Sequence, residues 1–124
     1  MFAALDALMA AQLPQMELYC EIGRVVSGRS EKGAAVAASE YLQDTYPATE
    51  GFSPRNLRRM RAFYAAYEAS PEIMRLAMYL GWTQNVAILE RCGSSGERAW
   101  YIRAVLHFGW KKAKLLAAIE SQAW

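Results

Sequence analysis

The chain has 124 residues, of which 54% are hydrophobic and 21% are charged. This composition excludes an intrinsically disordered chain and predicts a single globular domain over residues 1–124. The sequence has no run of about 18 uncharged apolar residues, which excludes a transmembrane helix. The apolar segment Met1–Leu13 contains Asp6 and lacks the basic start of a signal peptide, so we expect this segment to be a helix.

Charge is distributed unevenly along the chain, although the net charge is only +2. Residues 1–50 contain three basic and seven acidic side chains, whereas residues 51–124 contain eleven basic and five acidic ones. This asymmetry predicts a positive potential on one part of the molecule. Ordinary surface charge is the alternative interpretation.

Apolar residues recur at spacings of three and four along almost the whole chain, which is typical of amphipathic helices. No alternating pattern is long enough to indicate a strand. The predicted fold class is therefore all-α, a compact multi-helix bundle with a helix-turn-helix-like unit. In chain order, the expected helices cover about residues 2–13, 15–30, 34–46, 54–68, 71–80, 84–91, 95–108 and 110–122.

Residues with special backbone preferences mark the ends of these helices. Ser53 followed by Pro54 predicts a helix start, because the hydroxyl caps a free N–H and proline suits the first helical position. Ser94 with Glu97 three residues later predicts a capping box. The other expected boundary residues are Pro14, Gly33, Pro47, Gly51 with a positive φ, Ser70 with Pro71, Gly81 as a C-terminal cap, Thr83 as an N-terminal cap, Gly93, and Gly109 as a stop.

The helix expected to begin at Pro54 is the most informative segment, because it has four arginines within seven residues. At about 100° per residue, apolar side chains form one stripe and the arginines lie mostly on the other side. The predicted packing stripe is Leu57, Met60, Tyr64 and Tyr67, with Phe63 at its edge. Arg55, Arg58 and Arg59 cluster on the opposite side, and Arg61 flanks them.

Guanidinium groups match phosphate oxygens in bidentate geometry and pair with guanine edges. The order of elements is that of a helix-turn-helix: a helix, a connector with a glycine, and a second helix rich in arginine and asparagine. The connecting segment 47–52 is longer than the tightest turns found in that motif. A solvated basic face, or salt bridges to the acidic N-terminal half, is the alternative. The candidate nucleic-acid-binding residues are Arg55, Asn56, Arg58, Arg59 and Arg61, with Lys111 and Lys112 as a second basic cluster beside Lys114. For these lysines a tolerated surface run is favoured over phosphate binding.

Other reactive or aromatic residues predict no chemistry. Cys20 and Cys92 form no CxxC pair and are expected to be buried, reduced thiols of a cytoplasmic protein. His107 has no partner at ligand spacing and is expected to be half-buried at a helix end. We therefore expect no enzyme activity, metal or cofactor. Core packing is favoured over base stacking for the aromatic residues Trp82, Trp100, Tyr101, Phe108 and Trp110.

Several segments, in order, resemble the N-terminal domain of the YhcG/DUF1016 family, which precedes a PD-(D/E)xK nuclease domain in bacterial proteins. The stretch from Gly51 to Tyr64, GFSPRNLRRMRAFY, is the most specific of them. The match covers about residues 15–122 and leaves 1–14 as an additional N-terminal helix. The other matching segments are Leu18–Arg24, Trp82–Val86 with Leu89–Glu90, Glu97–Tyr101, Gly109–Trp110 and Ile119–Gln122.

The resemblance implies a helical domain of DNA-binding character attached to a nuclease. Arg55, Asn56, Arg58 and Arg61 match the family pattern, whereas Cys20, Thr83-Gln84 and Lys111-Lys112 depart from it. Two functions follow as hypotheses. The first is a non-catalytic DNA-binding module that uses the arginine-rich helix. The alternative is a protein-interaction module, which forms a homodimer through residues 1–14 or docks a nuclease domain or subunit.

Overall fold

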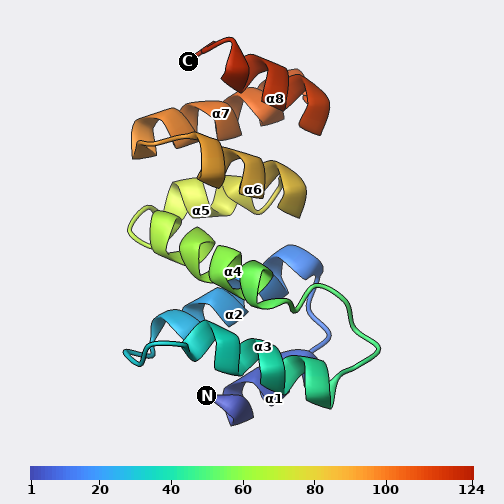
Figure 1. Cartoon of the computed structure of the whole chain (residues 1–124). Coiled ribbons are helices and arrows are strands. Elements are labelled where there is room, and N and C mark those ends of the chain that lie inside the picture. The colour runs from blue at the N-terminus through green and yellow to red at the C-terminus, as the bar shows by residue number, and fades with distance from the viewer. The chain divides into compact units, whose positions relative to one another are not determined.

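The computed structural model describes all 124 residues and consists of eight helices and no strand (Figure 1), which confirms the predicted all-α class. The chain forms two compact units, Met1–Ala65 and Ala66–Trp124. One helix, α4 (Pro54–Tyr67), begins in the first unit and ends in the second. None of the eight helices combines the length and the apolar character that a membrane span requires.

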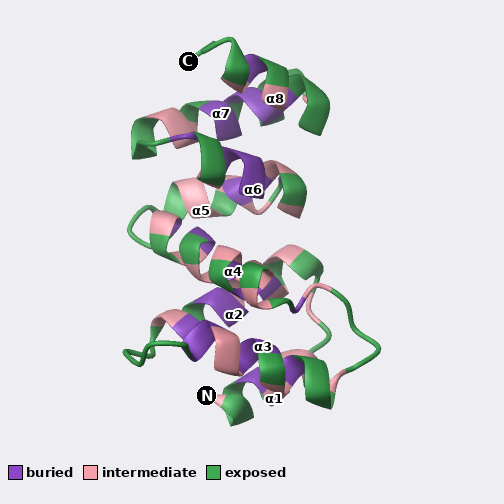
Figure 2. Cartoon of the chain, in the orientation of Figure 1, coloured by how far each residue is buried: buried purple, intermediate pink, exposed green.

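The first unit contains α1 (Phe2–Ala10), α2 (Gln15–Ser27), α3 (Ala34–Thr45) and most of α4. Helix α1 packs against both α2 and α3. Its inward residue Leu5 is fully buried, and the buried residues of the unit form its interior (Figure 2). The largest fully buried side chains of this interior are Leu5, Ile22, Val26, Leu42, Phe52, Leu57, Met60 and Phe63.

A carboxylate fastens α1 to α3. The hydroxyl groups of Tyr41 and Tyr46 donate hydrogen bonds of 2.6 and 2.7 Å to the two carboxylate oxygens of Asp6. The ring of Phe2 stacks on that of Tyr41, with the ring centroids 4.3 Å apart. Helix α1 is therefore integrated into the first unit through both its polar and its apolar side chains.

The second unit contains the end of α4, α5 (Pro71–Ala77), α6 (Trp82–Arg91), α7 (Ser95–Phe108) and α8 (Lys112–Glu120). The buried amide of Asn85 donates hydrogen bonds to the carbonyl oxygens of Ala77 and Gly81, which links α6 to the end of α5. The hydroxyl of Tyr101 donates to the carbonyl of Ala118 and so links α7 to α8. All four tryptophans of the chain belong to this unit.

Most predicted helix boundaries agree with the structure, but the first, second, fifth and last helices are shorter than expected. Helix α1 ends at Ala10, because Gln12 adopts a positive φ of 51° before Pro14. Gly81 is extended and is the N-cap of α6, not the C-cap of α5. The side chain of Gln84 accepts the Gly81 N–H at 2.7 Å, so Thr83 lies inside the helix rather than capping it.

Candidate nucleic-acid interface

The connector between α3 and α4 is held firmly from both sides. The hydroxyl of Ser39 and the side-chain amide of Gln43, both on α3, donate hydrogen bonds of 2.5 and 2.9 Å to the carbonyl of Phe52. The ring of Phe52 is buried. Gly51 has the predicted positive φ, at 95°, and a Cβ there would lie 2.2 Å from the hydroxyl oxygen of Tyr19. The start of α4 is thus fixed by contacts with α2 and α3.

The first turn of α4 confirms the predicted start. The hydroxyl of Ser53 accepts the backbone N–H of Asn56 at 3.1 Å, and Pro54 is the first helical residue. The side-chain amide of Asn56 donates to the carbonyl of Gly51 at 2.6 Å. Because this amide closes the connector against the helix, the structure gives Asn56 a positioning contact inside its own chain.

The inward face of α4 differs from the predicted stripe in one pair of residues. Phe63 is fully buried, whereas Tyr64 is only half-buried at the edge, so their expected places are exchanged. Leu57, Met60 and Tyr67 are buried as expected. The exchange follows from the geometry of a helix that contacts neighbours over a wide sector, in which positions six apart, such as 57 and 63, both reach the core.

Helix α2 crosses α4 at very close range. A Cβ on Gly23 would lie 2.2 Å from the carbonyl oxygen of Met60 and 3.2 Å from the Cβ of Tyr64. Glycine is the residue type that allows two helix backbones to approach this closely. The crossing therefore holds the middle of α4 at a defined position in the first unit.

The outward face of α4 presents arginines. Arg55 and Arg58 are exposed one turn apart, and Arg59 and Arg61 are half-buried on its two flanks. No carboxylate pairs with Arg55, Arg58 or Arg61. Two ion pairs of the first unit, Arg24 with Glu21 and Arg29 with Glu31, do not involve these three arginines.

The charge asymmetry of the sequence does not coincide with the division into units. The first unit contains seven basic and seven acidic residues, and the second contains seven basic and five acidic ones. The positive charge is therefore local rather than a property of half the molecule. In the first unit it is concentrated on the first half of α4, where four arginines occur without an acidic residue between Gly51 and Tyr67.

The second predicted basic cluster lies in the other unit. Lys111, Lys112 and Lys114 are exposed at the start of α8. This helix has no side-chain cap and no acidic residue in its first turn. The lysines thus add positive charge where the helix dipole is already positive, an arrangement that disfavours the folded state unless an anion is present.

Several other predictions have definite outcomes. Both cysteines are free thiols, and Cys92 is buried as expected, whereas Cys20 is only half-buried. Burial raises the pKa of each above its usual range, to about 11 for Cys92. His107 is exposed, not half-buried as expected, because it lies on the outer side of the last turn of α7. No group of three or more histidine, cysteine, aspartate or glutamate side chains is arranged to hold a metal ion.

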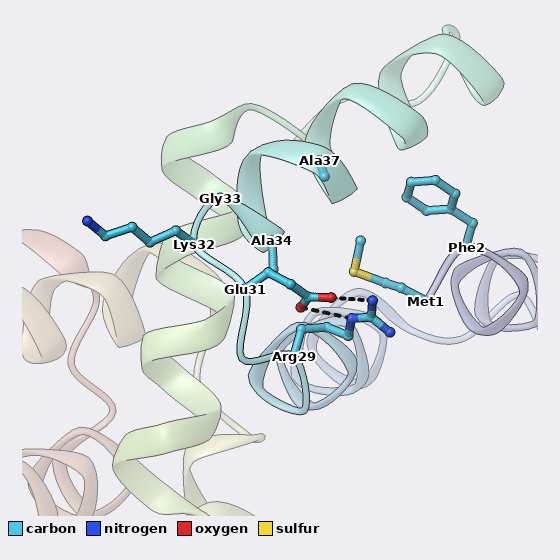
Figure 3. Close-up of a pocket in the computed structure, with 8 residues that line it drawn as sticks. All are labelled: Met1, Phe2, Arg29, Glu31, Lys32, Gly33, Ala34 and Ala37. Carbon is cyan, nitrogen blue, oxygen red and sulfur yellow. Dashed lines mark hydrogen bonds and ion pairs between the residues drawn. The ribbon is translucent and has the colours of Figure 1, made fainter.

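A pocket of about 340 Å³ lies in the first unit between the starts of α1 and α3 and the loop after α2. Arg29 and Glu31 pair with each other at its wall, and Lys32 extends away from the other lining side chains (Figure 3). None of the predicted nucleic-acid-binding residues lines it. The pocket is separate from the arginines of α4.

The aromatic prediction holds only in part. Tyr101 is fully buried, and Trp82 and Trp110 are half-buried, but Trp100 is 37% and Phe108 60% exposed. The signal for the exposure of Phe108 is its place directly before the helix stop Gly109, at the end of its helix. Periodicity alone does not predict the surface that Phe108 forms.

The model of one family, the DUF1016 N-terminal domain, matches residues 3–124. The chain belongs to the DUF1016 N-terminal domain family. The match reaches further than the resemblance over residues 15–122, so in this DUF1016 N-terminal domain α1 is part of the family domain, consistent with the buried Leu5. Comparisons with curated proteins and with solved structures gave no match.

Proposed function

We propose that this DUF1016 N-terminal domain is a non-catalytic DNA-binding module that binds phosphate groups through the arginines of α4. The observation that supports the proposal is that the residues of the stretch Gly51–Tyr64 fall into two groups, those that make contacts within the fold and those that are exposed. Its glycine, phenylalanine, serine, asparagine, leucine and methionine are all occupied by the fold, whereas Arg55 and Arg58 are exposed and unpaired.

The geometry of α4 suits a duplex. Arg55 and Arg58 are three residues apart, so their side chains leave the same face of the helix about 5–6 Å from each other at Cβ. An α-helix with side chains is about 10–12 Å wide, close to the width of about 12 Å of the DNA major groove. Arg61, on the flank of this face, extends the positive surface to one side.

The pair α3–α4 has the order of a helix-turn-helix, with α4 in the place of the recognition helix. Its connector, residues 46–53, is longer than the turn of about three to four residues that is usual in this motif. The ordered contacts of Phe52 and Gly51 give the longer connector a fixed conformation. We therefore infer a helix-turn-helix-like unit that differs from the common form in its connector.

A salt titration of binding to a short fluorescent duplex tests this proposal. Each phosphate contact that is lost should reduce the slope of log K against log salt concentration by about 0.9. Arg55→Ala/Arg58→Ala should therefore lower the magnitude of the slope by about 1.8 and weaken binding to different sequences about equally. Circular dichroism should show unchanged helix content, because both side chains are exposed.

The matched control removes the same charge elsewhere. Arg75 and Arg91 are exposed arginines of the second unit, and Arg75→Ala/Arg91→Ala should leave the slope within error of the wild-type chain. Equal slopes for the α4 double variant and the wild type would exclude α4 as the binding surface. A loss of slope that is the same in both double variants would indicate only a general charge effect.

The family resemblance supports two further parts of the proposal. The first is an association of this domain with a PD-(D/E)xK nuclease domain or subunit. In that assembly α4 would hold the DNA and the nuclease would cut it. The second is a location in the bacterial cytoplasm, where such a nuclease meets DNA. Co-purification of the chain with a separately expressed nuclease domain tests the association, and the absence of a complex at micromolar concentration would contradict it.

The alternative function, self-association through the first helix, is favoured by one exposed side chain. Phe2 is 44% exposed, although its ring stacks on Tyr41. Deletion of residues 1–14 is not a suitable test, because it would remove Leu5 from the core. Light scattering of the wild type and of Phe2→Ser is the appropriate comparison: a dimer should weaken in the variant, and a monomer in both would contradict the alternative.

A further inference from the structure

The turn between α7 and α8 exposes an aromatic surface. The Phe108 side chain, at 60% exposure, is one of the most accessible large apolar groups of the chain. One of its ring faces stacks on Trp110, with centroids 5.3 Å apart and the planes 16° from parallel. The His107 ring meets Phe108 edge-on at 4.7 Å. An ordered ring thus remains accessible at the surface.

The backbone of this turn is fixed by several hydrogen bonds. Gly109 adopts a left-handed conformation with φ of 68°, and the N–H groups of Gly109 and Trp110 both donate to the carbonyl of Val105. The side-chain amide of Gln84 on α6 donates to the carbonyl of Trp110 at 2.7 Å. The backbone that bears the two stacked rings is therefore fixed before any ligand arrives, which reduces the entropy lost on binding.

Three exposed lysines follow the aromatic pair directly. Lys111 is the N-cap residue of α8, and Lys112 and Lys114 lie in its first turn. The helix start has no capping side chain and no acidic residue. Phosphate groups placed here would meet both the lysines and the positive end of the helix, and would relieve the repulsion between them.

We propose that this surface, formed by Phe108, Trp110, Lys111, Lys112 and Lys114, binds an unpaired nucleic-acid strand. A base stacks on the accessible face of Phe108, and the neighbouring phosphates bind the lysines and the uncapped start of α8. Aromatic platforms beside basic side chains are the usual means of binding single strands without sequence preference. Lysine is depleted at protein–protein interfaces, which argues for a polyanion over a protein partner.

This site lies in the second unit and is independent of the duplex interface proposed for α4. The experiment compares three labelled strands bound to the full chain: an oligothymidylate, an oligouridylate and an abasic strand of the same length. The abasic strand keeps the phosphates and removes the bases. The wild type should bind at least one of the two base-containing strands more tightly than the abasic strand, by roughly five- to a hundredfold if one base stacks.

Substitution of the platform should remove the preference and leave the fold intact. Phe108→Ala should bind all three strands alike, whereas Phe108→Tyr should restore the preference because it keeps the ring. Lys111→Ala/Lys112→Ala should weaken binding to all three strands and lower the salt dependence. The matched control is Trp124→Ala, which removes a ring that is 57% exposed and lies against Gly96, at the opposite end of α7.

The outcomes separate this proposal from that for α4. A base preference that persists in Arg55→Ala/Arg58→Ala but disappears in Phe108→Ala supports the single-strand site, whatever the result with duplex DNA. Equal affinity of the wild type for the base-containing and abasic strands overturns it, and so does a preference that survives Phe108→Ala. Failure to bind any strand also overturns it and would favour a protein partner for the exposed rings.

Discussion

Substitution of Gly23 by alanine tests whether the position of α4 depends on its close crossing with α2. The added Cβ would lie 2.2 Å from the Met60 carbonyl oxygen and 2.8 Å from its carbonyl carbon. Real Cβ contacts are essentially never shorter than 3.0 Å. Because the opposing atoms belong to the backbone, no side-chain rotation relieves the overlap, and the two helices must separate by about 1 Å.

The expected loss of stability follows from two opposing contributions. Overpacking of this kind costs about 1–3 kcal/mol, and a backbone clash belongs at the upper end of that range. Replacing glycine by alanine within a helix returns about 1 kcal/mol through the lower entropy of the unfolded chain. We therefore expect a net destabilisation of about 1–2 kcal/mol, or a fall of about 4–8 °C in Tm for a domain of this size.

Thermal melting followed by circular dichroism measures the effect. Gly28→Ala is the matched control, because it makes the same chemical change at the end of the same helix. A Cβ at Gly28 would meet nothing closer than 3.5 Å, and its φ of −72° is available to alanine. The free energy of unfolding of this control should differ from that of the wild type by no more than about 0.5 kcal/mol, the range that is usual for surface substitutions, and its Tm should change little. A Gly23→Ala variant that melts at or above the wild-type temperature would refute the argument from the helix crossing.

Two further predictions concern the contacts that fix the first unit. Gly51→Ala combines a φ of 95° with a Cβ 2.2 Å from the hydroxyl oxygen of Tyr19, so the urea midpoint should fall by the equivalent of roughly 1–3 kcal/mol, and an unchanged midpoint would contradict this. Hydrogen bonds from Tyr41, the larger cause, and from Tyr46 lower the pKa of Asp6 below 3.8. The ionised carboxylate therefore contributes to the stability of the folded chain above that pH, and this contribution is lost as the pH falls through the depressed pKa. The Tm of the wild type should therefore decrease in acid more steeply than that of Asp6→Asn, and parallel curves would show that Asp6 contributes nothing.

The same carboxylate raises the pKa of Tyr46 to about 12, chiefly through their hydrogen bond. The protonated hydroxyl is the form that donates this bond, so the stabilisation is complete below pH 10 and is lost as the pH rises toward 12. Acid thus weakens the attachment of α1 by protonating the carboxylate of Asp6. Alkali weakens it by deprotonating the hydroxyl of Tyr46.

Local capping chemistry explains why many helix ends could be predicted. Ser53 with Pro54, Ser94 and Gly109 act on groups within a few residues of themselves, and the structure places them as expected. The capping box predicted for Ser94 and Glu97 forms only in part, because the Glu97 carboxylate accepts the N–H of Gly93 instead of that of Ser94. The prediction that Gly81 is the C-cap of α5 is wrong, because a glycine between two helices fits either end. The side chain of Gln84, which accepts its N–H, decides the matter.

Burial was less predictable because it depends on contacts between distant segments. Nothing in the local pattern of α1 indicates that Asp6 bonds to tyrosines 35 and 40 residues away. The exchange of Phe63 and Tyr64 depends on where neighbouring helices contact α4, which the periodicity of one helix does not specify. The exposure of Arg55 and Arg58 was predictable, since the face opposite a strong apolar stripe is rarely covered.

The placement of every tryptophan between Ala66 and Trp124 supplies a natural optical label. Fluorescence excited selectively at indole responds to the surroundings of that unit alone, whereas the backbone ellipticity averages over both. Superimposable unfolding curves from the two signals would establish a single cooperative transition, and separated curves would reveal which half opens first. The native tryptophans therefore allow the unfolding of the second unit to be compared with that of the whole chain without any attached dye.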